Sequence, residues 1–268
     1  MKTELAHPVA YTLLLDDQQV RLNPAIGHPI KLTYQGVIHC THCGRKSRKS
    51  FNQGYCYPCF KKLAQCDICI VSPEKCHFDQ GSCREPDWGE ANCFQPHFVY
   101  LANSSGVKVG ITRHTQIPTR WIDQGAVAAL PVLKVRSRKI SGLLEVAFKA
   151  YVADKTSWQR MLKGVAEPVD LYMRRDELLA RIEPEIASLC ESMGDDAVEV
   201  LADQPVVDIH YPVETYPTKV KSLNFDKTPE VSGVLQGIKG QYLLLDSGVI
   251  NIRKFGGYHI ELDCDALN

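Results

Sequence analysis

The sequence predicts an α+β protein in which a cysteine-rich, metal-binding region interrupts a series of short strands and helices. Three observations carry this prediction. Cysteines recur in C-x-x-C pairs between residues 40 and 69, residues 97–154 follow the order strand, strand, helix, strand, helix, and residues 206–262 hold apolar runs separated by turns that contain glycine. We expect five parts: N-terminal β-strands (1–38), a zinc-binding region (39–96), a mixed domain (97–163), an acidic helical segment (164–204) and a domain like a small β-barrel (205–268).

Composition narrows the protein class. The chain has 268 residues, 44% of them hydrophobic, which suits one large or two to three small globular domains. No stretch approaches the roughly 20 apolar residues that span a bilayer, and residues 1–8 lack the apolar core of a signal peptide. We therefore expect a cytoplasmic protein that does not contact membranes. In that reducing compartment, the eleven cysteines indicate metal ligands rather than disulfides.

The N-terminal part is expected to form strands of a small sheet that leads into the cysteines. Residues 9–15 are an apolar run, Asp16 and Asp17 suit a turn, and Ile30, Leu32 and Tyr34 alternate as they do on one face of a strand.

Two cysteine pairs give the strongest signal in the sequence. Cys40 and Cys43 are followed, after 12 residues, by Cys56 and Cys59. Two thiolates spaced in this way fit one tight knuckle, and two knuckles supply the four sulfurs of a closed tetrahedral site. Gly44 suits the positive φ angle that a knuckle needs after its second ligand. The sequence thus predicts structural Zn²⁺ here, with an iron–sulfur cluster as the alternative.

The loop between the two pairs is basic and ends at an aromatic residue. A loop of this composition can hold phosphate groups and stack a base, although it can also be simply solvated. The loop residues that we predict to bind nucleic acid are Arg45, Lys46, Arg48 and Lys49, with Phe51 at the edge.

A second cluster of five cysteines follows directly. One tetrahedral site needs four ligands, so one cysteine is in excess. Residues 81–90 show little helical or strand periodicity and need a cross-link to be ordered. We predict a second Zn²⁺ site with Cys76 spare or exchanged for one of the ligands; buried reduced thiols are the alternative. The predicted ligands are Cys66, Cys69, Cys83 and Cys93.

Residues 97–154 carry the predicted mixed domain. Two apolar runs flank a polar turn at residues 103–106, which predicts a hairpin. A short helix over residues 117–124 ends at Gly125, and a third strand is expected over residues 130–135. Leu144, Phe148 and Tyr151 share one face of a final helix, predicted over residues 140–152.

These residues resemble the GIY-YIG nuclease superfamily. Val99-Tyr100-Leu101 stands where that family has its first tripeptide and Lys108-Val109-Gly110 where it has the second, with Arg120 and Glu145 matching its arginine and its metal-binding glutamate. The resemblance covers residues 97–155 and implies a ββαβα core. The whole chain is also similar to an uncharacterised bacterial family that joins cysteine clusters to such a core.

The resemblance implies a divalent-metal-dependent endonuclease. Glu145 would hold Mg²⁺ or Mn²⁺, Arg120 would stabilise transition-state charge, Tyr100 would position the attacking water, and Arg113 could contact phosphate. Lys108 stands where active nucleases usually carry a tyrosine, and as an ammonium it cannot act as a base unless its pKa is strongly lowered. The alternative is that these residues have structural roles only: Glu145 pairs with Lys149, Arg120 pairs with Asp123, and Tyr100 only packs.

The remaining chain combines acidic helix and β-structure. Residues 154–162 begin like a capped helix, and residues 174–193 form an acidic amphipathic helix candidate that Pro184 interrupts. Residues 206–262 are predicted to form strands of a small barrel. If the N-terminal strands complete this barrel, the two ends of the chain come together.

Charge is strongly segregated although the net charge is zero. Residues 18–66 hold eight basic and no acidic residues, residues 97–163 hold 11 basic and 3 acidic ones, and residues 165–215 hold 3 basic and 13 acidic ones. A basic front indicates a polyanion partner, DNA or RNA, while the acidic segment can meet a protein partner or shield the basic part. The leading hypothesis is a nucleic-acid-binding zinc protein that can be an endonuclease. The alternative is a non-enzymatic RNA- or DNA-binding or ribosome-associated adaptor.

Overall fold

A computed structural model describes residues 1–15, 18–152 and 157–267, and it has the predicted α+β architecture. The predicted turn at residues 16–17 and the cap expected at Asp154 lie outside the described residues. The helices are α1 (Tyr57–Lys62), α2 (Pro86–Cys93), α3 (Thr119–Asp123), α4 (Arg138–Lys149), α5 (Trp158–Met161) and α6 (Leu171–Met193). The strands are β1 (Lys2–Glu4), β2 (Ala10–Leu15), β3 (Gln18–Arg21), β4 (Pro29–His39), β5 (Lys46–Ser47), β6 (His97–Asn103), β7 (Val107–Arg113), β8 (Ala128–Val135), β9 (Val198–Val200), β10 (Val207–Asp208), β11 (Glu230–Lys239), β12 (Tyr242–Leu245), β13 (Gly248–Asn251) and β14 (Tyr258–Asp263).

The mixed domain has the predicted order of elements, β6-β7-α3-β8-α4. Its sheet runs β10-β8-β6-β7, with β9 added beside β8, and all of these pairs are antiparallel. The central strand β6 is buried along almost its whole length, as its apolar sequence predicts. Strand β7 lies at the edge, which leaves its far side open to the rest of the chain.

Helix α4 packs on one face of this sheet. The hydroxyl of Ser137 caps it by accepting a hydrogen bond from the backbone N–H of Ile140. Ile140, Leu144 and Phe148 are buried at i, i+4 and i+8, so the predicted apolar stripe is present, while Tyr151 lies beyond the helix and is 41% exposed. The other sheet face buries Tyr100 and Trp121 in a separate core.

The C-terminal strands form a half-barrel rather than a closed barrel. The sheet runs β13-β12-β11-β4-β14 with β5 beside β4, and no ladder joins β13 to β14 among the described residues. The N-terminal strand β4 sits between β11 and β14, so the two ends of the chain do share one sheet. The three-stranded sheet β1-β2-β3 supplies Val9, Tyr11 and Leu13 to the core of the half-barrel.

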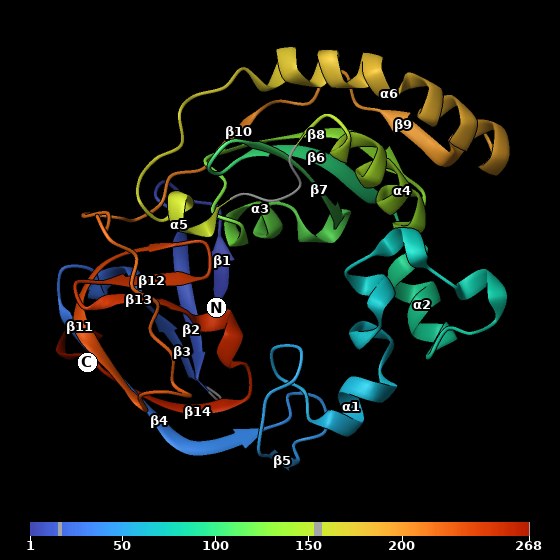
Figure 1. Cartoon of the computed structure of the whole chain (residues 1–268). Coiled ribbons are helices and arrows are strands. Elements are labelled where there is room, and N and C mark those ends of the chain that lie inside the picture. Colours follow the sequence, from blue (N-terminus) through green and yellow to red (C-terminus); the bar gives the residue numbers. More distant parts are fainter. Residues whose placement is uncertain (16–17, 153–156, 268) are drawn as a thin grey trace.

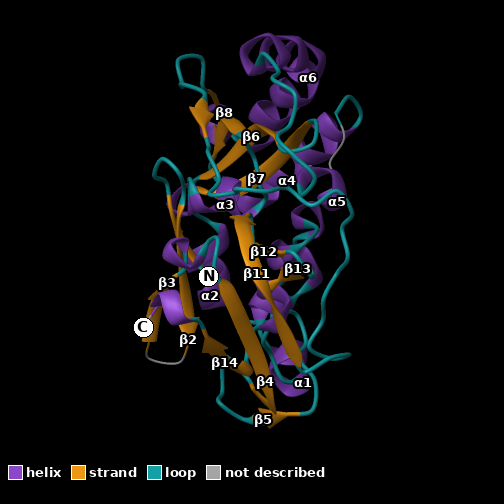
Figure 2. Cartoon of the chain, turned by 90° about the vertical axis from the view of Figure 1, so that its left-hand side faces the viewer, coloured by secondary structure: helices purple, strands orange, loops and turns teal. Residues whose placement is uncertain are grey.

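Helix α6 lies across the top of the molecule in Figure 1 and again in Figure 2, at the opposite end from β5 and the basic loop. The carboxylate of Asp170 caps it by accepting from two backbone N–H groups, and the helix continues through Pro184 instead of breaking there. The acidic segment therefore does not cover the basic loop.

Helix α4 gives a test of how the cysteine-rich segment packs on the mixed domain. A Cβ at Gly142 would lie 2.6 Å from the backbone N of Glu74 and 2.7 Å from the Cβ of Pro73. Alanine normally favours a helix by about 1 kcal/mol over glycine, but overpacking against backbone costs about 1–3 kcal/mol. We predict that Gly142→Ala lowers the melting temperature by several degrees in a thermal unfolding scan. Gly164→Ala, which meets no atom within 4 Å, is the matched control, and a rise in melting temperature for Gly142→Ala would contradict the packing described.

Candidate functional site

The four cysteines of the first two pairs converge on one point. The sulfurs of Cys40, Cys43, Cys56 and Cys59 all lie within 4.8 Å of one another, and those of Cys43 and Cys56 are 3.7 Å apart. Four sulfurs at about 2.3 Å from a tetrahedral Zn²⁺ are separated by about 3.8 Å, so the arrangement fits the ion. The four cysteines can therefore hold a structural zinc ion, as the sequence predicts.

The backbone of this cluster favours a thiolate at Cys40, whereas burial and then the neighbouring thiols raise the pKa of Cys59 to about 12. Gly44, with a φ of 68°, closes the first knuckle by donating its N–H to the carbonyl of Cys40. Burial opposes ionisation of the Cys40 thiol, but backbone N–H groups of Cys43, Cys56 and His42 lower its pKa to about 6. A divalent cation would offset the repulsion between several such thiolates held together.

The basic loop projects from this cluster. Arg45, Lys46, Arg48 and Lys49 are all exposed, and the Lys49 ammonium lies 5.6 Å from the centre of the Phe51 ring. Phe51 in turn stacks on Phe60 of α1, with ring centres 5.7 Å apart. The loop thus presents exposed positive charges beside an aromatic ring, where a partner can reach them.

The tip of the loop reaches into a large cavity. Asn52 and Gln53 adopt left-handed backbone angles, with φ values of 43° and 65°, and both line that cavity. A non-glycine residue in this region is strained and needs its surroundings to hold it there. The Gln53 side chain provides one such contact, because its carbonyl accepts a hydrogen bond from Nε of Arg253.

The cavity has a volume of about 810 Å³ and is lined by separate parts of the chain. These are the tip of the basic loop, residues 65–73, β7 with α3, helix α4, and the Arg253 turn of the half-barrel. Its charged lining comprises Arg113, Arg120, Arg138, Arg253, Asp123 and Glu145.

Three of the predicted site residues meet in this cavity. Arg113 and Arg120 approach from β7 and α3, and Glu145 from α4. Arg120 has no ion pair with a carboxylate among the described residues, since Asp123 instead pairs with Arg253 at 3.2 Å. Glu145 does pair with Lys149, at 3.4 Å. Arg113 and Arg138 also lack a carboxylate partner among the described residues, and they donate to Asn92 and to the carbonyl of Ile70 instead. Arg120 hydrogen-bonds to the Tyr100 hydroxyl.

Tyr100 and Lys108 lie beneath the cavity rather than in its wall. Tyr100 is fully buried, packs edge-on against Trp121, and its hydroxyl accepts a hydrogen bond from Gln124 at 2.6 Å. A Cβ at Gly110 would lie 2.6 Å from the Tyr100 hydroxyl, so only glycine fits opposite this ring. Burial, and next the charge of Arg120, lower the pKa of Lys108 to about 8.

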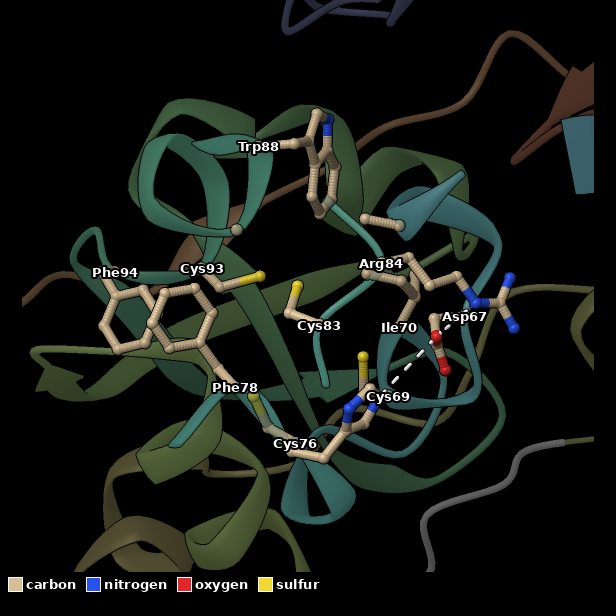
Figure 3. A pocket seen from close by; sticks show the side chains of 13 residues that line it. Asp67, Cys69, Ile70, Cys76, Phe78, Cys83, Arg84, Trp88, Cys93 and Phe94 are labelled. Atoms are coloured by element: carbon tan, nitrogen blue, oxygen red, sulfur yellow. Dashed lines mark ion pairs between the residues drawn. The ribbon is translucent and has the colours of Figure 1, made fainter. Parts of the chain in front are cut away.

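In the second cysteine cluster, the cysteines that line one common cavity differ from the predicted set of ligands. Cys69, Cys83 and Cys93 line one small enclosed cavity, and Cys76, expected to be spare or exchanged, lines it with them (Figure 3). Cys66 does not line this cavity; it is buried near Asn52 and Cys40.

Sequence reasoning missed two of the cavity arginines. Arg138 opens α4 about two turns before Glu145, and this seven-residue spacing, which places both side chains on one helix face, could have revealed it. Arg253 carries no such signal, because its ion pair with Asp123 joins distant parts of the sequence.

The first cluster allows a direct test of zinc binding. Replacing an exposed thiolate ligand removes one of four sulfurs without disturbing the core, so Cys43→Ser should lower the zinc content by about one ion per chain and loosen the loop. Elemental analysis and native mass spectrometry measure the metal. Cys190→Ser in α6 is the control and should retain all zinc. Unchanged zinc in Cys43→Ser would exclude this set of ligands.

None of the described helices combines the length and the hydrophobicity that a membrane crossing needs. Comparisons with known proteins match one family model, described as "Protein of unknown function (DUF2797)", over residues 27–260. Nothing among curated proteins or solved structures matches the chain. These comparisons give no evidence of GIY-YIG similarity, which stays a prediction, whereas the expected membership of an uncharacterised family is confirmed. Because the match covers most of its length, the chain belongs to the DUF2797 family.

Proposed function

We propose that this is a zinc protein that binds nucleic acid in its central cavity and cleaves a phosphodiester bond there with a divalent metal ion. The observation that carries the proposal is the convergence of Arg113, Arg120 and Glu145 on one cavity of about 810 Å³. Phosphoryl transfer uses a positive group to stabilise the phosphate and a carboxylate to hold the metal ion. Arg120, which has no acidic partner among the described residues, and Glu145 supply these two groups. The resemblance to GIY-YIG nucleases assigns the same roles to Arg120 and Glu145.

The electrostatics of the cavity favour a polyanion. Its charged lining holds four arginines against two carboxylates, and one of those carboxylates, Asp123, is neutralised by Arg253. Arginine suits phosphate because its planar group donates two parallel hydrogen bonds. The exposed basic loop continues from one wall of the cavity, while the acidic helix α6 lies at the other end of the molecule (Figure 2). A nucleic acid strand can therefore follow a basic path from the loop into the cavity.

The roles of the reacting groups follow from their positions. Glu145 would hold Mg²⁺ or Mn²⁺, which supplies Lewis acidity to the phosphate and the leaving oxygen. Arg120 stabilises the charge that develops on the phosphoryl oxygens. Tyr100 is fully buried with its hydroxyl engaged by Gln124, so it orients the floor of the site rather than reacting.

Lys108 stands where active GIY-YIG nucleases usually have a tyrosine, but like Tyr100 it does not line the cavity. Burial, and next the charge of Arg120, lower its pKa to about 8, so most of these side chains are positively charged at physiological pH. A general base must lie within hydrogen-bond reach of the attacking water, so the role that we propose for Lys108 is electrostatic. Solvent accepts the proton as the water oxygen bonds to phosphorus, and the P–O bond to the leaving group breaks, with solvent protonating that oxygen.

A second candidate function is binding without cleavage. The Glu145–Lys149 pair is the observation that favours it, because a carboxylate already held by an ammonium is a weaker site for a divalent ion. In that case the cavity would bind nucleic acid, and the protein would act as an adaptor.

Two substitutions separate these functions. Glu145→Ala should abolish Mg²⁺- or Mn²⁺-dependent cleavage of labelled DNA and structured RNA while binding changes by less than about threefold. Arg120→Ala should lower both cleavage and affinity, the latter by roughly tenfold for a lost charge-assisted contact to phosphate. Gel-shift and cleavage assays at several salt concentrations measure the two quantities.

Arg136→Ala is the matched control for these variants. Arg136 is exposed, pairs with Asp196 and does not line the cavity, so its loss should leave both activities unchanged. Cleavage that survives in Glu145→Ala would contradict the catalytic proposal, and an absence of binding at low salt in the native protein would contradict both functions.

The pH dependence of binding tests Lys108. Its pKa is lowered to about 8, so its positive charge is present below about pH 8 and is lost above it, and the affinity for nucleic acid should fall as the pH rises through 8. Lys108→Arg keeps its charge in this range, so its affinity should stay constant across pH 8. The same pH profile for the native chain and for Lys108→Arg would remove Lys108 from the proposal.

A further inference from the structure

The second cysteine cluster surrounds a cavity of the size of one ion. Cys69, Cys76, Cys83 and Cys93 line an enclosed space of about 20 Å³, which holds little more than one water-sized sphere. In Figure 3 the four thiols extend toward the same space from four different short segments. All four cysteines are free thiols, so no disulfide connects these segments.

The segment that carries these thiols has only a small apolar interior. Residues 36–97 contribute nothing to the three hydrophobic clusters of the protein. Between α1 and α2 the segment contains only short 3₁₀ turns, and Ile68 and Val71 are 55% and 72% exposed. Leu63 and Ala64 are buried, but a segment with so few buried apolar residues is stabilised by additional cross-links.

The neighbouring ligand types are already engaged. The carboxylate of Asp67 accepts from Nε of Arg84 at 2.5 Å and from the backbone N–H of Ile68, so its charge is balanced. His77 hydrogen-bonds to Ser82 through Nδ1 and faces Asp67 through Nε2. Cys66 lies outside the cavity altogether. Asp67, Cys69 and His77 place ligand atoms within 4.8 Å of one another, but Asp67 and His77 already contact Arg84 and Ser82. The four thiols around the cavity remain, and four sulfurs complete a structural zinc site.

We propose that Cys69, Cys76, Cys83 and Cys93 bind a second structural Zn²⁺ ion, with Cys66 excluded from the site. The four residues come from the turn Ile68–Ile70, the end of the turn Pro73–Lys75, the approach to α2, and the last residue of α2. One ion thereby joins four places along residues 69–93 into a single unit.

This site also positions two arginines of the central cavity. The carbonyl of Ile70, next to Cys69, accepts a hydrogen bond from Arg138 at 2.5 Å. The side-chain carbonyl of Asn92, next to Cys93, accepts one from Arg113, also at 2.5 Å. Each contact lies one residue from a proposed ligand, so the ion fixes the wall from which both guanidinium groups extend.

Metal counts on single variants test the ligand set. The native chain is expected to contain about two zinc ions by native mass spectrometry and elemental analysis. Cys76→Ser and Cys83→Ser should each contain one, while Cys66→Ser, the matched control from the same segment, should contain two. Circular dichroism shows whether each variant is folded. Two ions in folded Cys76→Ser with one in Cys66→Ser would overturn the assignment, and so would a native chain with only one zinc ion.

Thiol mapping of the native chain provides a measurement that does not depend on any variant. Two tetrathiolate sites use eight of the eleven cysteines and leave Cys66, Cys190 and Cys264. Mild alkylation should modify the partly exposed Cys190 first, and it should reach Cys69, Cys76, Cys83 and Cys93 only after a chelator removes the metal. Rapid alkylation of these four in zinc-loaded protein would contradict the site. Both tests measure bound zinc or thiol reactivity, so their outcome does not depend on whether the protein cleaves nucleic acid.

Discussion

The structure depends on how residues 36–97 are held in place, because hydrophobic burial alone does not order them. Residues 36–97 connect the half-barrel to the mixed domain, yet none of them belongs to a hydrophobic cluster. Their order therefore depends on convergent thiols and on polar contacts to the parts at either side. The four-cysteine cluster of Cys40 to Cys59 is the clearest example, since its sulfurs already stand at the spacing of a tetrahedral zinc site.

The same connection creates the central cavity. The zinc loop contributes Asn52 and Gln53, whose strained backbone is held against Arg253 of the half-barrel. On the opposite side, Arg138 and Arg113 are held by oxygen atoms of the cysteine-rich segment. A cavity whose walls come from several segments exists only when all of them are docked, so the proposed chemistry depends on the order of the cysteine-rich segment.

Basic and acidic residues are also separated within the fold. Overall neutrality conceals a basic loop and a cavity rich in arginine at a distance from the acidic helix α6. The separation shows that α6 does not cover the basic loop, although Glu199 and Asp196 of the acidic segment pair with Lys134 and Arg136 of the mixed domain. Within the cavity, the Asp123–Arg253 pair leaves Arg120 without a carboxylate partner among the described residues.

The sequence by itself determined the α+β class, the order of elements over residues 97–154 and the first cysteine cluster, because local periodicity and C-x-x-C spacing act over a few residues. It also named Arg120 and Glu145 as candidates, and the structure brings both to one cavity. Only the tertiary structure decided which cysteines line one cavity in the second cluster, since Cys66 and Cys76 are equally plausible by spacing and differ only in where their segments fold. It likewise decided that β13 and β14 do not pair to close the barrel, and that Arg253 pairs with Asp123, which lies 130 positions earlier in the chain.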